Sequence, residues 1–237
     1  MKIFLQLAMA TAVVMSLVPS AGAAATITER LEQYGPGARA RLEPYFQKQG
    51  IAYPPAQIAF IGLKQEKLLQ IYARNGTNGF VWIRSYPILA ASGTLGPKLH
   101  EGDRQVPEGI YEIESLNPNS HFHLSLRINY PNAFDREQAR KENRAALGGD
   151  IMIHGNAVST GCLAMGDKAA EDLFVLAADT GLKNITVILS PVDFREKKTV
   201  ASLEKMPAWT TSLYETLGTR LKQFPKEPLP DRSTEAK

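Results

Sequence analysis

The middle of the chain consists of apolar runs separated by short polar stretches, a pattern typical of sheet proteins. The segments QIAFIGL (57–63) and KLLQIYAR (67–74) are joined by polar residues and predict a β-hairpin. Together with the strands that follow, they predict a mainly β domain over residues 56–191. The further strands are predicted at residues 80–89, 109–116, 121–130, 150–155 and 184–191.

A helical pattern precedes this domain. Residues 26–50 are predicted to be helical in two pieces, because Gly35-Pro36-Gly37 interrupts the pattern, and Thr28 is expected to cap the first piece. A boundary is predicted at the proline-containing stretch 53–57, where the periodicity changes from helical to strand-like.

Further helices are predicted towards the C-terminus. Asp167 is expected to cap a helix over residues 168–180, which Gly181 ends. Another helix is predicted around residues 208–224, and the Pro- and charge-rich end after it is expected to be disordered.

The first residues carry the features of a secretory signal peptide. Lys2 precedes an apolar core that ends at Val18, and small residues then supply a cleavage site near residues 23–25. A membrane anchor is the competing interpretation, but the core is short of the about 20 residues that span a bilayer. We expect export to the periplasm, with no integral membrane segment after cleavage. The chain is thus divided into a signal peptide (1–25), an N-terminal helical segment (26–55), a β domain (56–191) and a C-terminal helical tail (192–237).

Composition and charge narrow the possible functions. The chain has 237 residues, 44% of them hydrophobic, and a net charge of +3 with no clustered basic run, so a nucleic-acid partner is not expected. It contains one cysteine, Cys162. A lone cysteine in an exported protein indicates an intermolecular bridge or a reactive thiol, and the alternative is a small buried apolar side chain.

The surroundings of Cys162 favour a reactive thiol. The stretch IMIHGNAVSTGCLAMGD (151–167) places His154 at the end of a predicted strand and the cysteine eight residues later, in a glycine- and serine-rich loop. A nearby imidazole can accept the thiol proton, and backbone amides beside Gly161 can donate to a developing oxyanion. A histidine that only satisfies a hydrogen bond at a strand end is the alternative.

These residues resemble a known family. The segment IMIHGNAVSTGCLAM resembles the His-Gly … Ser-x-Gly-Cys signature of the L,D-transpeptidase (YkuD-type) catalytic domain, and EGDRQVPEGIYEI (101–113) resembles the segment upstream of it. The resemblance covers residues 56–191 and implies a β-sandwich-like fold with helical additions. Within the family, INYPNAFD (128–135) and the alanine after the motif are most similar to the murein L,D-transpeptidase branch labelled YafK-like.

The resemblance implies roles for the loop. Cys162 matches the nucleophile and His154 the general base and acid, while Gly155, Ser159, Thr160 and Gly161 match positions that shape the loop and the oxyanion site. The implied substrate is peptidoglycan with diaminopimelate-containing stem peptides, attacked to give a thioester that an amine or water resolves. No cofactor is implied.

Two departures leave the outcome open. Many members have His where Thr160 stands and Arg where Ala164 stands. The alternatives are therefore a cysteine amidase that hydrolyses a diaminopimelate linkage between peptidoglycan and an attached outer-membrane lipoprotein, and a non-catalytic cell-wall-binding protein.

Other polar residues are weaker candidates. His121 and His123 share one face of a predicted strand, but no further ligands complete a metal site, so no metal is expected. His100, Asp103 and Arg104 are candidates for a substrate cleft, with loop and turn roles as the alternative. The charged stretch 135–144 is interpreted as a lid or as an ordinary solvated helix.

Overall fold

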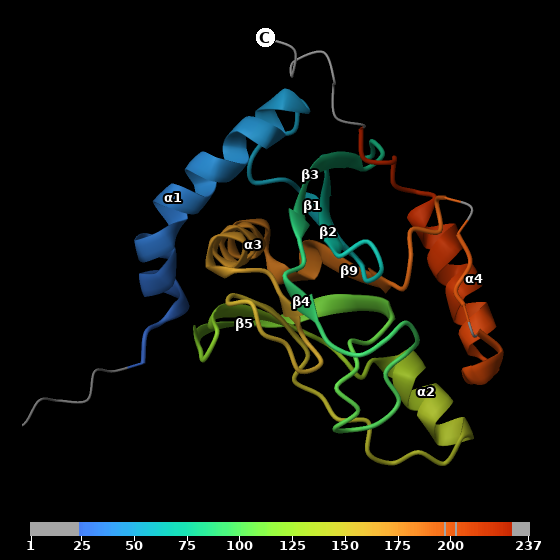
Figure 1. Cartoon of the computed structure of the whole chain (residues 1–237). Coiled ribbons are helices and arrows are strands. Elements are labelled where there is room, and N and C mark those ends of the chain that lie inside the picture. Colours follow the sequence, from blue (N-terminus) through green and yellow to red (C-terminus); the bar gives the residue numbers. More distant parts are fainter. Residues whose placement is uncertain (1–23, 197, 202, 229–237) are drawn as a thin grey trace, which may run out of the picture.

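The computed structural model describes residues 24–196, 198–201 and 203–228. Within these ranges, four α-helices, nine strands and two short 3-10 turns are present. Figure 1 shows their arrangement. Their bounds are α1 Ile27–Lys48, β1 Gln57–Leu63, β2 Leu68–Arg74, β3 Val81–Pro87, β4 Ala90–Ala91, β5 Gly109–Ser120, β6 His123–Ile128, α2 Ala133–Lys141, β7 Met152–His154, β8 Leu163–Ala164, α3 Asp167–Thr180, β9 Ile185–Ser190 and α4 Thr210–Leu221.

The strands form one continuous sheet in the order β3-β2-β1-β9-β5-β6-β7-β8-β4. The strand β5 connects its two halves, because its first residues pair with β9 and its later residues pair with β6. Most neighbours are antiparallel, whereas β1 with β9 and β7 with β8 are parallel. The predicted hairpin is present as β1 and β2, paired antiparallel over their full lengths.

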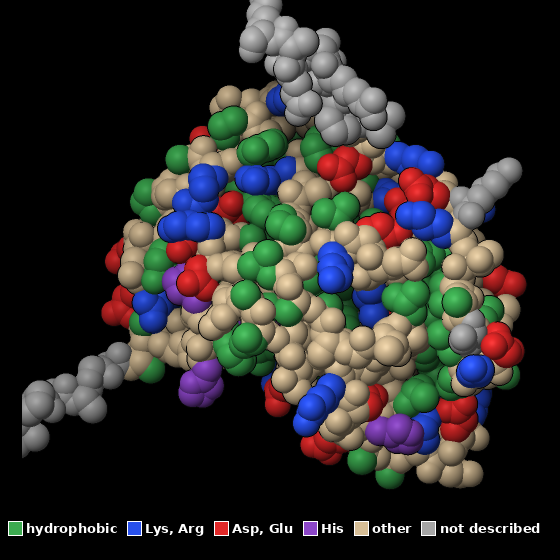
Figure 2. Space-filling model, in the orientation of Figure 1, with side chains coloured by type: hydrophobic (Ala, Val, Ile, Leu, Met, Phe, Trp, Pro, Cys, Tyr) green, Lys and Arg blue, Asp and Glu red, His purple; other side chains and the backbone are tan. Residues whose placement is uncertain are grey.

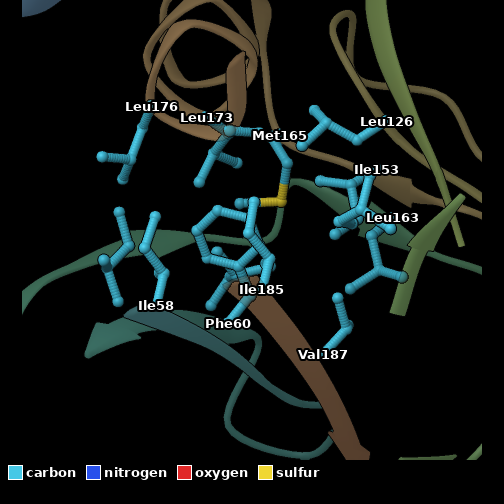
Figure 3. Packing of buried hydrophobic residues seen from close by; sticks show 14 of the residues in the cluster. Ile58, Phe60, Leu126, Ile153, Leu163, Met165, Leu173, Leu176, Ile185 and Val187 are labelled. Carbon is cyan, nitrogen blue, oxygen red and sulfur yellow. The ribbon is translucent and has the colours of Figure 1, made fainter. Parts of the chain in front are cut away.

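One face of the sheet packs against α3, which α1 covers in turn (Figure 1). Figure 3 shows Leu173 and Leu176 of α3 facing side chains from both halves of the sheet, among them Phe60 of β1 and Ile153 of β7. Burial of these apolar side chains is the main source of stability for a domain of this size. It also fixes the strands β7 and β8 on a rigid support.

The opposite face of β1, β2 and β9 packs against the C-terminal part of the chain. Leu213, Leu217 and Leu221 recur at helical spacing on α4 and join Tyr72 and Ile188 in a second apolar cluster. The segment predicted as a tail is therefore part of the core. The expected mainly β fold with helices added at both ends is confirmed.

The N-terminal helix differs from the prediction. α1 is one helix that contains Pro36 and Pro44, and Thr26 caps it in place of Thr28. A proline inside a helix costs about 3 kcal/mol. Packing on α3 offsets that cost, since Arg39 makes a bidentate ion pair with Asp179 at 2.8 Å. Tertiary contacts outside the segment therefore override the local helix-breaking signal.

The start of α3 and the two ends of the chain were also the subject of predictions. Gly166, not Asp167, is the N-cap of α3, which ends at Gly181 as predicted. The signal peptide falls outside the described ranges apart from Ala24 and Ala25, and so does the part of the predicted disordered end that follows residue 228. The first residues of that end are described, and Glu227 accepts from Ser85 of β3 at 2.8 Å. Among the described residues, no helix combines the length and the apolar character that crossing a bilayer requires. On the face drawn in Figure 2, Lys and Arg side chains are interspersed with Asp and Glu.

Candidate active site

The sheet places His154 and Cys162 on the same face. His154 is the last residue of β7, and Cys162 immediately precedes β8, which runs parallel to β7 with His154 opposite Ala164. Ile153 and Leu163 of the same register both point into the core. Because side chains alternate along a strand, His154 and Cys162 both point to the other face.

The protonation state of His154 follows from its hydrogen bond. Its Nδ1 lies 2.6 Å from the backbone oxygen of Gly155, which can only accept, so Nδ1 carries the proton and Nε2 is free to accept one. The ring of Phe122 packs on the imidazole with centroids 4.7 Å apart. Burial lowers the pKa of His154, and the bond to Gly155 opposes this only in part. The imidazole is therefore neutral at pH 7.

The thiol of Cys162 is half-buried, and its Sγ lies 3.7 Å from the backbone oxygen of Asp150. Burial raises the pKa of the thiol, the Asp150 carboxylate adds to the rise, and a bond from the Met152 backbone and the charge of Lys98 oppose it. The resting site thus holds a neutral thiol and a neutral imidazole. These two described side chains make no hydrogen bond to each other, so the expected thiolate–imidazole pair stays a prediction.

Two serine hydroxyls hold the loop before Cys162. Ser159 Oγ donates to the backbone oxygen of Cys162 at 2.6 Å and accepts from its amide at 3.2 Å. Ser92 Oγ accepts from the Gly161 amide and donates to the backbone oxygen of Arg104 at 2.7 Å. The amides of Gly161 and Cys162 are therefore occupied, and an oxyanion would compete with Ser92 and Ser159 for them.

Two glycines are required by this geometry for different reasons. Gly161 has a φ of +92°, which side chains rarely adopt. At Gly155 the obstacle is steric, because an added Cβ would lie 2.6 Å from Asp167 Oδ1 and 2.7 Å from the backbone oxygen of Phe122. The Asp167 carboxylate accepts from the Asn156 amide at 2.8 Å and so ties the loop to the start of α3.

A cavity of about 340 Å³ is lined by Asp150, whose backbone oxygen lies 3.7 Å from the thiol sulfur. Thr160 and Gly161 form one side of it, and the rest is formed by Lys98, Glu101, Gly102, Arg104 and residues 148–151. Larger cavities of about 450 Å³ and 500 Å³ lie elsewhere, along α4 and the segment after it. Of these three cavities, only the one of about 340 Å³ is lined by Gly161, the residue before Cys162. Substrate is therefore expected in that cavity.

Asp103 organises the turn that borders this cavity. Its carboxylate accepts from the amides of Leu99, His100 and Gln105 at 2.9–3.0 Å and from the Lys98 ammonium. Partial burial raises the pKa of Asp103, but these bonds outweigh it and hold the pKa below its usual range. Of the three cleft candidates, Asp103 thus shapes the turn, and only Arg104 lines the cavity.

The remaining candidates lie apart from the thiol. His121 is exposed, and His123 Nε2 lies 3.2 Å from Glu171, which joins the hairpin to α3. Ala164 is fully buried and places no charge at its position.

The charged stretch forms α2 and a loop whose Arg144 donates to the backbone oxygen of Leu99 at 2.9 Å. Glu142, just after α2, accepts from Trp209 of the C-terminal segment at 2.9 Å. These contacts anchor the loop beside the cavity.

Three residues of the site were missed by sequence reasoning. Ser92, Lys98 and Phe122 contact the loop, the turn and the imidazole from segments distant in sequence. Only Phe122 carries a signal, since it is an exposed aromatic residue between the two histidines that drew attention.

Comparison with known proteins identifies one family. A sequence model of the L,D-transpeptidase catalytic domain (YkuD) matches residues 56–191. The putative L,D-transpeptidase YafK of Escherichia coli, from strain K12 and from O157:H7, is 35% identical over 129 residues, which are 54% of this chain and 49% of the relative. The chain therefore spans about half the length of the curated relatives it matches.

Solved structures show weaker likeness. The helical cell shape determining protein Pgp2 of Campylobacter jejuni is 22% identical with a TM-score of 0.47, and covers 61% of this chain and 49% of Pgp2. Bd1075 of Bdellovibrio bacteriovorus is 20% identical with a TM-score of 0.42, and covers 70% of this chain and 55% of its own.

Proposed function

The chain belongs to the L,D-transpeptidase (YkuD) catalytic domain family, and from that premise we propose that it is an exported cysteine acyltransferase acting on peptidoglycan stem peptides. The observation that carries the proposal is the placement of His154 at the end of β7 and of Cys162 just before the parallel strand β8, with its Sγ 3.7 Å from the backbone oxygen of Asp150, which lines a cavity. The Gly155 carbonyl leaves Nε2 of His154 ready to accept a proton. We further propose that residues 1–25 direct export to the periplasm.

The neutral resting pair sets the order of events. The Cys162 sulfur attacks the carbonyl carbon of a diaminopimelate residue, and its proton moves to Nε2 of His154 as the S–C bond forms. The tetrahedral intermediate collapses, the C–N bond breaks, and the imidazolium returns the proton to the leaving amine. The remaining thioester is resolved by an acceptor amine, which gives transfer, or by water, which gives hydrolysis.

Hydrolysis of a diaminopimelate linkage to a lipoprotein is the second candidate. It is favoured by the half-exposed thiol and by the charged lining of the cavity, which admits water to the thioester. In both reactions the nucleophile and the base are the same residues, so the acceptor alone distinguishes them.

The test is a digest of peptidoglycan by the purified protein, followed by separation and mass spectrometry of the muropeptides. New cross-links or exchanged terminal residues indicate transfer, and released peptide without new bonds indicates hydrolysis. Cys162→Ala and His154→Gln should abolish the products, whereas His121→Gln, on an exposed hairpin position, should not. Unchanged products with Cys162→Ala would overturn the proposal, and a wild-type protein that binds peptidoglycan without products would indicate a binding role.

A further inference from the structure

The cavity beside the thiol contains charges that its own residues leave uncompensated. Four charged side chains line it. Lys98 pairs with Asp103, and Asp150 pairs with Arg127 at 2.7 Å. The other two, Arg104 and Glu101, are exposed and make no ion pair with any residue in the described ranges. One cation and one anion thus remain available to a ligand.

Arg104 is presented by a rigid turn. The bonds from three amides and Lys98 to Asp103 fix the backbone on either side of it, and Ser92 holds its carbonyl oxygen. Arg104 itself has a φ of +55°, a conformation that glycine or asparagine adopts at lower cost. The backbone that carries the guanidinium is therefore held in place, and only the side chain has to be ordered when it binds a ligand.

The balance of charge indicates the class of ligand. A strongly positive cavity would fit a phosphate, whereas this lining carries both signs in equal number. Glycines 102, 148 and 149 keep the walls low, so that a ligand can reach the backbone as well as the two free charges. A group with one carboxylate and one ammonium complements such a lining.

We propose that this cavity binds the free amino-acid end of the diaminopimelate side chain, with Arg104 on its carboxylate and Glu101 on its ammonium. This inference rests on the proposed function. The carbonyl under attack and the free end belong to the same residue, separated by three methylene groups. Cys162 Sγ lies 3.7 Å from the backbone oxygen of Asp150, which lines the cavity, so a carbonyl at Cys162 has the cavity within reach of its free end.

The test compares three stem peptides that differ only at that end: the free form, a carboxamide in place of the carboxylate, and an N-acetyl group on the amine. Wild-type kcat/KM should favour the free form over each modified peptide by about tenfold or more, as expected for a lost charged hydrogen bond. Arg104→Gln should reduce the preference over the carboxamide to near one, and Glu101→Gln should do the same for the N-acetyl peptide. Arg140→Gln, on the exposed surface of α2, should change neither ratio.

Two results would overturn the inference while the proposed function stands: equal turnover of the three peptides by wild type, or an unchanged preference in Arg104→Gln. If no peptide is turned over, the proposed function fails, and a binding measurement then tests whether the cavity takes the free end of diaminopimelate. Free meso-diaminopimelate is then titrated into Cys162→Ala protein by NMR. Saturable shifts at residues 98–104 and 148–150 that weaken about tenfold with Arg104→Gln support the site. Their absence rejects it.

Discussion

Replacing Glu108 by glutamine should destabilise the fold strongly, because Glu108 compensates a buried cation. The residue is 1% exposed, and its Oε1 accepts from the Lys64 ammonium and from the Gly96 amide, both at 2.8 Å. Its Oε2 accepts from the Tyr214 hydroxyl of α4 at 2.7 Å. The carboxylate thus joins the residue after β1, the loop that contains Gly96 and the helix α4.

The magnitude follows from leaving Lys64 without a counter-charge. Its side chain is 6% exposed, and breaking a buried pair by removing one partner costs about 3 to 5 kcal/mol. Burial lowers the pKa of Lys64, and the Glu108 carboxylate opposes that effect. Loss of the carboxylate therefore favours release of the lysine proton, which places the expected cost near the lower end, about 3 kcal/mol.

Urea unfolding monitored by circular dichroism measures the change in unfolding free energy. Tyr214→Phe, which removes one bond to the charged carboxylate, should cost about 1.5 to 3 kcal/mol. The double variant Lys64→Met/Glu108→Gln should recover most of the loss, since no unpaired charge remains and the amide oxygen can still accept a hydrogen bond. A loss below about 1 kcal/mol for Glu108→Gln, or a double variant less stable than the single one, would refute the reasoning.

Three further results are expected. Burial raises the pKa of Asp135 to about 6, above the unfolded value of about 3.9. The protonated carboxyl therefore stabilises the fold fully below pH 4, and this contribution is lost as the pH rises to about 6. Unfolding at several pH values should show that Asp135→Asn removes up to about 3 kcal/mol of this pH dependence. Alkylation of Cys162 by iodoacetamide should still accelerate with pH beyond the ordinary thiol pKa, because burial raises its pKa, and a plateau near neutrality would contradict this. Gly161→Ala should cost about 1 to 3 kcal/mol through its positive φ, measured by thermal unfolding with Gly79→Ala, in open space, as the control.

The longer strands could be predicted from sequence because each contains an apolar run that indicates a strand without reference to the rest of the chain. The hairpin at 57–63 and 68–74 is present where expected. β4 and β8 have two residues each, too short to leave a periodic pattern, yet β8 pairs with β7 directly after Cys162. The single helix α1 was not predictable, because its prolines are offset by ion pairs to a helix about 130 residues away in the sequence.

The site was predictable where its signal is local. The stretch 151–167 contains both His154 and Cys162, and its glycines indicate a loop with unusual backbone dihedral angles. Ser92 and Lys98 reach the site only through the fold, so their residue types alone gave no indication of it. The group that orients His154 is a backbone carbonyl, which no sequence pattern can reveal.

The most direct measurement is the mass of the protein during turnover. Rapid acid quenching of wild type mixed with a diaminopimelate-containing stem peptide should trap the acyl fragment as an adduct located by peptide mapping on Cys162. Hydroxylamine should release it, as expected of a thioester. Turnover with no adduct on that sulfur, and at an undiminished rate in Cys162→Ala, would contradict the account.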